Sequence, residues 1–292
     1  MTGAASLRAR AEADSARLPP LLARAEHLAG TVLLGEHGRR RAGTGDDFWQ
    51  YRPVQPGDAY RDIDWRRSAR SDTEFVRQRE WQVAQSVMMW VDDSASMRFT
   101  SGDAIPEKAD RARLLAMAAA VLLLRAGERV GLSGGRLPPR RGEAQKHRLA
   151  AALSQTGAAE YGSPDIRGLL PHGKALFVSD FLGDLDRVRD GLTAAADRGV
   201  RGIVLQVLDP AEEAFPYRGR TIFESMGGSL AHETLKADEL RARYLERLAA
   251  RKDELRRLCD ATGWQYGIHH TGTSAQAELL WLYSAFEAEG RA

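Results

Sequence analysis

The stretch "SVMMWVDDSASMR", residues 86–98, decides the fold, because a run of apolar residues ends abruptly in a cluster of polar oxygens. The run "SVMMWV" has no alternation of polar and apolar residues, which is typical of a strand buried on both faces of a parallel sheet. The cluster "DDSAS" at residues 92–96 follows at once. It is either a polar turn that caps a helix or one half of a site for a divalent cation.

Downstream of this stretch, predicted strands alternate with predicted helices. The strands are "RVGLSGG", "KALFVSDF", "RGIVLQVLD" and "WQYGIHH", which begin at residues 129, 174, 201 and 264. The helices span residues 107–126, 143–155, 185–199, 238–262 and 274–289. This alternation predicts an α/β fold with an open, mostly parallel, doubly wound sheet. The stretch "RTIFESMGGSLAHET" at 220–234 interrupts the alternation and predicts an inserted hairpin.

The chain upstream of the first strand has a different character. Residues 18–34 have the spacing of a helix, whereas residues 46–80 are dense in Arg, Asp and aromatic residues with short extended pieces. We therefore expect an N-terminal helical and β-rich appendage before the α/β domain. The expected parts are a helical segment over residues 1–35, a second region over 36–84 and the α/β domain over 85–292.

Composition argues against several classes of protein. The 42 basic residues nearly balance the 40 acidic ones, and the net charge of +2 does not indicate nucleic-acid binding. The single Cys259 rules out an internal disulfide framework and fits a reducing compartment. No apolar run is long enough for a transmembrane helix, and the first residues lack the apolar core of a signal peptide. We expect a cytoplasmic location. The basic stretch that begins "RLPPRR" at Arg136 is interpreted as a solvated loop.

Polar side chains at the ends of two strands suggest a common site. In open parallel sheets, ligands bind beyond the carboxyl ends of the strands, where the strand order switches. Asp92, Ser94 and Ser96 follow the first core strand, and Asp180 follows another central strand at the same edge. Hard oxygen ligands of this kind suit Mg²⁺, Mn²⁺ or Ca²⁺ and not zinc or copper.

The pattern D-x-S-x-S at Asp92 resembles the metal-ion-dependent adhesion site of the von Willebrand factor A fold. In that fold a hydroxyl from a later loop and an aspartate after a later strand complete the metal shell. The stretch "GSPDIRGLL" resembles the later loop, with Ser163 at the position of the family's threonine. The stretch "FVSDF" resembles the aspartate element, with Asp180 at that position. The resemblance thus implies a sheet of the von Willebrand factor A type and a site for Mg²⁺ or Mn²⁺.

A second resemblance covers "YRPVQPGDAYRDIDWRRSAR", residues 51–70, which is similar to the signature of the bacterial domain-of-unknown-function-58 family. The matching residues are Pro56, Gly57, Asp58, Arg61, Ile63, Asp64, Trp65, Ala69 and Arg70. The residues alone favour a structural role, a turn followed by a partly buried clasp of ion pairs around Trp65. The family implies partnership with MoxR-type AAA+ ATPases in chaperone-like maturation of other proteins. Many members carry transmembrane helices before the signature, and this chain does not.

Enzyme signatures are absent from the sequence. It contains neither G-x-x-x-x-G-K-[ST] nor G-x-S-x-G, and Cys259 lies in a helical pattern without a nearby His. We expect a non-enzymatic protein-interaction module that docks an acidic residue of its partner through a divalent cation. Two alternatives stay open. One is a Mg/Mn-dependent phosphohydrolase built on Asp92 and Asp180, with Arg98 as its only nearby clamp, and the other is a structural scaffold with a degenerate metal site.

Overall fold

The computed structural model describes residues 20–35, 48–55, 60, 63–69, 73–79, 85–226, 228 and 231–288. The chain divides into two compact units. The larger unit contains the described residues of 1–35 and 85–292, and the smaller unit those of 36–84. No helix in the described part of the chain is long and apolar enough to cross a membrane.

The larger unit is built on a sheet that has six strands within the described residues, in the order β10-β7-β6-β3-β4-β5. Every neighbouring pair is parallel except β4 and β5, which are antiparallel. This confirms the prediction of an open, mostly parallel sheet. The strands are β3 (Ser86–Val91), β4 (Arg129–Leu132), β5 (Leu137–Arg140), β6 (Lys174–Ser179), β7 (Arg201–Leu208) and β10 (Gln265–His270).

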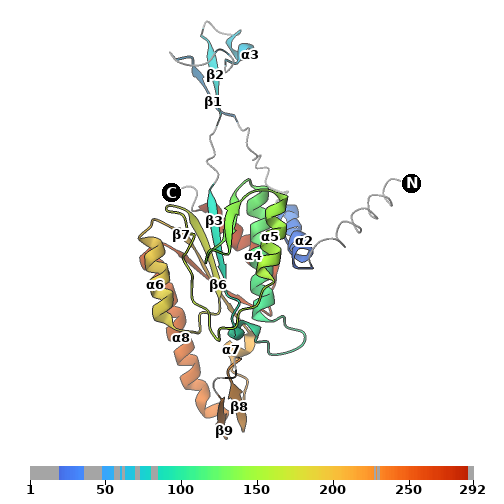
Figure 1. Ribbon diagram of the computed structural model, residues 1–292, viewed down its shortest axis with the longest axis vertical. Coiled ribbons are helices and arrows are strands. Elements are labelled where there is room, and N and C mark those ends of the chain that lie inside the picture. The colour runs from blue at the N-terminus through green and yellow to red at the C-terminus, as the bar shows by residue number, and fades with distance from the viewer. Residues whose placement is uncertain are drawn as a thin grey trace, which may run out of the picture. The chain divides into compact units, whose positions relative to one another are not determined.

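Helices cover both faces of this sheet (Figure 1). One face packs against α2 (Pro20–Gly35), α4 (Lys108–Arg125), α5 (Glu143–Leu153) and α9 (Ala275–Ala288). The other face packs against α6 (Leu185–Ala196) and α8 (Ala237–Thr262). The alternation of side chains along β3 explains the two layers, because Val87 and Met89 join the first core and Met88 joins the second. The continuous apolar run in the sequence is therefore a strand buried on both faces.

The strand order reverses between β3 and β6. The chain leaves β3 for β4 on one side of it, and later returns to place β6, β7 and β10 on the other side. Val91 and Val178 are neighbours in the β3–β6 register, so Asp92 and Asp180 leave the sheet at the same edge. In open α/β sheets this switch point is where ligands bind.

One stretch of the chain differs from its sequence prediction. The residues expected to form a solvated loop after Arg136 contain the edge strand β5, which pairs with β4 through Leu132 and Leu137. Pro138 and Pro139 lack backbone N–H groups, which an edge strand tolerates because one side of it needs no ladder partner. The two prolines led the sequence prediction to a loop, although an edge strand can contain them.

The predicted hairpin insertion is present. Strands β8 (Thr221–Glu224) and β9 (Ala231–Thr234) pair antiparallel, with Thr221 opposite Thr234. The hairpin follows the short helix α7 (Pro210–Ala214) and leads directly into α8.

The smaller unit contains an antiparallel pair, β1 (Phe48–Pro53) and β2 (Phe75–Arg79), and the short helix α3 (Trp65–Ser68). Asp64 caps α3, since its Oδ1 accepts a hydrogen bond from Arg67 N at 3.1 Å. Trp65 is 47% exposed and lies against Tyr60, with ring centroids 4.9 Å apart. The other signature residues Pro56, Gly57, Asp58, Arg61 and Arg70 lie outside the described residues, so the expected clasp of ion pairs stays a prediction.

The close pairing of β6 with β7 can be tested at Gly202, which lies opposite Ala175. A Cβ atom there would lie 2.2 Å from the carbonyl oxygen of Ala175, which is backbone and cannot move aside cheaply. We expect Gly202→Ala to lower the free energy of unfolding by about 1–3 kcal/mol, measured by chemical denaturation. Gly102→Ala is the matched control, because nothing lies within 4 Å of its Cβ position. Equal stability of the two variants would contradict this packing.

Candidate functional site

Asp92 is fixed at the end of β3 by both of its carboxylate oxygens. Oδ2 accepts a hydrogen bond from Ser179 Oγ at 2.6 Å, and Oδ1 accepts one from Ser94 N at 2.9 Å. The Asp92 backbone N–H donates to Val178 O at 2.9 Å, which extends the β3–β6 pairing by one residue. The side chain is 2% exposed. The carboxylate therefore has one defined orientation at the switch point.

The two serines of the D-x-S-x-S pattern lie side by side. Ser94 Oγ and Ser96 Oγ are 3.2 Å apart, and both residues are buried. Ser94 is the N-cap of the 3-10 helix η3 (Ala95–Arg98), but its hydroxyl makes no capping hydrogen bond. The Ser94 hydroxyl therefore does not cap η3, and it is hydrogen-bonded to Ser96 Oγ instead.

The loop that contains Ser163 lies along this cluster. Ala95 N donates to Ala159 O at 2.8 Å, and Ser96 N donates to Glu160 O at 2.9 Å. A Cβ atom at Gly162 would lie 2.3 Å from Asp92 Oδ1, so only glycine allows the loop to approach the carboxylate this closely. Ser163 follows Gly162 directly, and its hydroxyl makes no hydrogen bond with the part of the chain that the structure describes.

Asp180 has a partner that the sequence did not predict. Lys108 Nζ donates to Asp180 Oδ2 at 2.8 Å and to Glu212 Oε1 at 2.6 Å. The second oxygen of Asp180, Oδ1, accepts from Leu182 N at 3.0 Å. Lys108 and Asp180 are each 1% exposed, so this ion pair is inside the molecule.

The pKa values of Lys108 and Glu212 are both raised, for different reasons. Burial opposes the charge of Lys108, but the negative charges of Asp180 and Glu212 outweigh it and raise the pKa of Lys108. Burial raises the pKa of Glu212, and the positive charge of Lys108 offsets this only in part. One signal in the sequence could have revealed Lys108. A lysine at the first position of a helix is opposed by the helix dipole, so it needs an acidic partner elsewhere.

Asp180 also influences the charge state of Asp92. Burial raises the pKa of Asp92, the hydrogen bonds from Ser179 and Ser94 oppose this, and the negative charge of Asp180 adds to it. The structure thus brings together the residues that the sequence singled out at this edge. Asp92, Ser94 and Ser96 form one cluster, Gly162 carries the start of the Ser163 loop to it, and Asp180 acts on it electrostatically.

The residues of the cluster fit a small divalent cation only in part. Adjacent ligands of an octahedral Mg²⁺ with bonds of about 2.1 Å are roughly 3 Å apart, close to the 3.2 Å between the hydroxyls of Ser94 and Ser96. Asp180 fits less well, because both of its oxygens already have donors. Among the residues that the structure describes, no group of three or more His, Cys, Asp or Glu side chains could hold a metal ion. A cation here would therefore depend on the serine hydroxyls.

The raised pKa of Asp92 predicts a pH dependence. Above the ordinary value of 3.8, the folded protein holds the proton of Asp92 more tightly than the unfolded chain, so ionisation costs stability as the pH rises. Asp92→Asn has no charge to bury. In EDTA, we expect the stability of this variant relative to wild type to increase as the pH rises above the ordinary value of 3.8, measured by urea denaturation.

Ser179→Ala provides a second check, because it removes a hydrogen bond that lowers the pKa of Asp92. The stability of Ser179→Ala should fall more steeply with rising pH than that of wild type. A stability difference between Asp92→Asn and wild type that stays constant with pH would show that burial does not disfavour the charge of Asp92.

Comparison with known proteins shows related chains without an assigned function. An uncharacterized protein of Mycobacterium bovis is 29% identical over 252 residues, which cover 80% of this chain and 77% of the relative. An uncharacterized protein of Mycobacterium tuberculosis matches to the same extent, 29% over 252 residues with 80% and 77% coverage.

Two solved structures are similar in part. One is the conserved hypothetical protein BatB from Bacteroides thetaiotaomicron, with a TM-score of 0.39 and 14% identity over 72% of this chain and 100% of that one. The other is an aerotolerance-related membrane protein from Bacteroides fragilis, with a TM-score of 0.37 and 13% identity over 70% and 100%.

The family model described as "Protein of unknown function DUF58" matches residues 50–254 of this chain. This range includes the whole signature at residues 51–70, the switch-point residues and the hairpin. It covers more than half of the sequence. The α/β architecture with a mostly parallel six-stranded sheet agrees with the fold that the sequence resemblance implied. The chain belongs to the DUF58 family.

Proposed function

We propose that this protein is a non-enzymatic interaction module that docks an acidic residue of a partner at the switch-point edge of its sheet. Asp92, Ser94 and Ser96 would hold Mg²⁺ or Mn²⁺, with Ser163 as a further candidate ligand. The observation that supports this most strongly is the spacing of 3.2 Å between two buried hydroxyls beside an oriented carboxylate. A divalent cation bound there supplies a positive centre with an open coordination position for a partner's carboxylate.

The ion pair of Lys108 favours docking of an acidic group. Lys108 is paired with Asp180, whereas the carboxylate of Asp92 has no cationic partner among its hydrogen-bond donors. A divalent ion bound by one carboxylate and neutral hydroxyls keeps a net positive charge, which attracts a carboxylate of the partner. Asp180 as a direct ligand would first have to release Lys108.

The segment at residues 157–160, which precedes Ser163, has to withdraw before a partner can reach the cluster. Three backbone hydrogen bonds hold it: Gly157 N to Asp93 O, Ala95 N to Ala159 O, and Ser96 N to Glu160 O. Each such bond contributes about 0.5–1.5 kcal/mol net. A partner that supplies a charged ligand and new hydrogen bonds can offset this cost, so docking and loop opening would be coupled.

The proposed partner is a MoxR-type AAA+ ATPase or its client, with this chain as an adaptor in the maturation of other proteins. This part rests on what the family resemblance implies. The proposed location is the cytoplasm, where such ATPases have access to ATP.

A phosphohydrolase is the enzymatic rival. Lys108 is a cation beside Asp180 of the kind that such an enzyme needs, but both side chains are buried and already paired. Arg98 is exposed. A phosphate would have to displace the ion pair to reach Asp180, so the geometry favours binding over hydrolysis.

The proposal predicts metal binding that depends on the cluster. Calorimetric titration of wild type with Mg²⁺ and Mn²⁺ should show binding that Asp92→Ala and Ser94→Ala weaken strongly, since even second-shell changes cost about 10–100-fold in metal affinity. Ser284→Ala is the matched control, because Ser284 is exposed on α9. A purified MoxR-type ATPase from the same host should then bind wild type in Mg²⁺ and lose binding in EDTA.

Three outcomes would separate the alternatives. Metal binding that is equal in wild type and Ser94→Ala would contradict the proposed ligand set. No metal binding and lower thermal stability of Asp92→Ala would leave the structural scaffold. Turnover of p-nitrophenyl phosphate with Mn²⁺ that disappears in Asp180→Ala would establish the enzymatic rival.

A further inference from the structure

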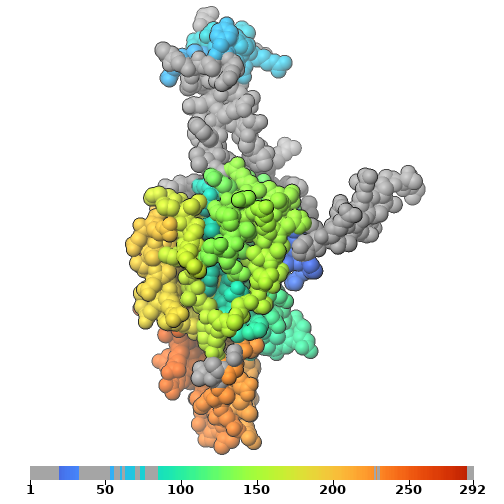
Figure 2. Space-filling view, viewed as in Figure 1, coloured from blue at the N-terminus to red at the C-terminus, as the bar shows by residue number. Residues whose placement is uncertain are grey.

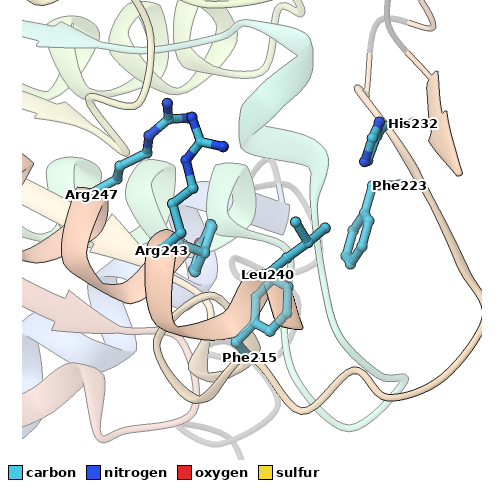
Figure 3. Close-up of a pocket in the computed structure, with 7 residues that line it drawn as sticks. Phe215, Phe223, His232, Leu240, Arg243 and Arg247 are labelled. Carbon is cyan, nitrogen blue, oxygen red and sulfur yellow. The ribbon is translucent and has the colours of Figure 1, made fainter. Parts of the chain in front are cut away.

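A cavity of about 430 Å³ lies between the β8–β9 hairpin and α8 (Figure 3). Phe223 and His232 come from the hairpin, and Leu240 and Tyr244 come from the first turns of α8. The volume is within the range of small-ligand and side-chain pockets, roughly 300–1,000 Å³. The cavity is separate from the Asp92 cluster, and no residue of that cluster lines it.

Aromatic rings form one wall of this cavity. The centroid of Phe215 lies 4.8 Å from that of Tyr244 and 5.6 Å from that of Phe223. Phe215 is in the left-handed backbone region with φ of 43°, which is strained for a bulky residue. Phe215 is the C-cap of α7, and its ring contacts make the wall an apolar surface suited to another ring or an aliphatic side chain.

Two arginines flank the aromatic wall. Arg243 and Arg247 are four residues apart on α8, and Figure 3 shows both side chains extending to the same side of the helix. Neither guanidinium has an ion pair or hydrogen bond with the residues that the structure describes, and both residues are exposed. Like charges at this spacing destabilise a helix slightly. The two guanidinium groups are therefore free to pair with an external anion.

The surroundings of the cavity are exposed and apolar. Ile222, Met226 and Leu235 of the hairpin region are 57%, 44% and 73% exposed. In Figure 2 the orange surface of the hairpin and the adjoining part of α8 projects from the larger unit. Only Ala237 is buried among the first ten residues of α8, so this end of the helix packs little against the sheet.

We propose that this cavity binds an acidic peptide segment of a partner protein, with one aromatic side chain of the peptide in the cavity. Carboxylates of the segment pair with Arg243 and Arg247 through charge-assisted hydrogen bonds, and the ring packs on Phe215 and Phe223. The binding requires no divalent cation, so it goes beyond the proposed docking at Asp92.

A peptide fits this surface better than a nucleic acid. The net charge of the chain is only +2, which provides little attraction for a polyanion. Two guanidinium groups beside an apolar wall match a few carboxylates around one ring.

The test uses a fluorescein-labelled peptide of Asp and Glu around one central Phe, titrated with the full chain in EDTA and followed by anisotropy. Arg243→Gln and Arg247→Gln should each weaken binding about threefold to tenfold, and the double variant more. Phe223→Ala should also weaken it. Arg257→Gln is the control, because Arg257 lies on α8 outside the cavity and is paired with Glu254. It should bind like wild type.

Two further probes make the result decisive. A peptide with Asn and Gln in place of the acids should lose binding, which would support pairing with the arginines. Equal affinity for wild type and the double arginine variant would overturn the proposal. Binding of a single-stranded oligonucleotide without binding of the peptide would overturn it as well. Because EDTA is present throughout, either result is independent of the metal site.

Discussion

The functional edge of this fold depends on the ion pairs that the buried ammonium of Lys108 makes with Asp180 and Glu212. This ammonium joins the start of α4, the end of β6 and the helix α7 through Asp180 and Glu212. Glu212 also accepts a hydrogen bond from Asp209 N and so completes the capping box of α7. Buried charges are tolerated only when they are paired and hydrogen-bonded. The position of each of these elements is therefore tied to the others by one cation.

This ion pair divides the acidic groups of the edge into two sets. Asp180 and Glu212 share the buried ammonium of Lys108, whereas Asp92 is held only by neutral donors. The uncompensated carboxylate is the one that lies beside the two serine hydroxyls. Helix α7 connects this ion pair with the aromatic cavity, because it contains Glu212 and its C-cap is Phe215. Burial, together with the negative charge of Glu212, raises the pKa of Tyr244 in the cavity wall.

Local patterns in the sequence predicted the parts of the structure that depend on local rules. Apolar runs gave the parallel strands, and the switch-point rule placed Asp92 and Asp180 at one edge. Lys108 could not be paired in this way, because its partners are 72 and 104 residues away. The close approach of Gly162 to Asp92 and the proline-containing strand β5 depend equally on tertiary contacts. The serine pattern showed which oxygens were present, and the fold determines which of them are already occupied by a donor.

A double-mutant cycle on Lys108 and Asp180 tests the central claim most directly. Lys108→Met leaves two buried carboxylates without a cation and should lose about 3–5 kcal/mol of unfolding free energy at neutral pH. Asp180→Asn leaves Lys108 paired with Glu212, so it should lose less. The account predicts that the double variant loses far less than the sum of the two. Losses that add within about 0.5 kcal/mol would show that the two groups do not interact, and would contradict the account.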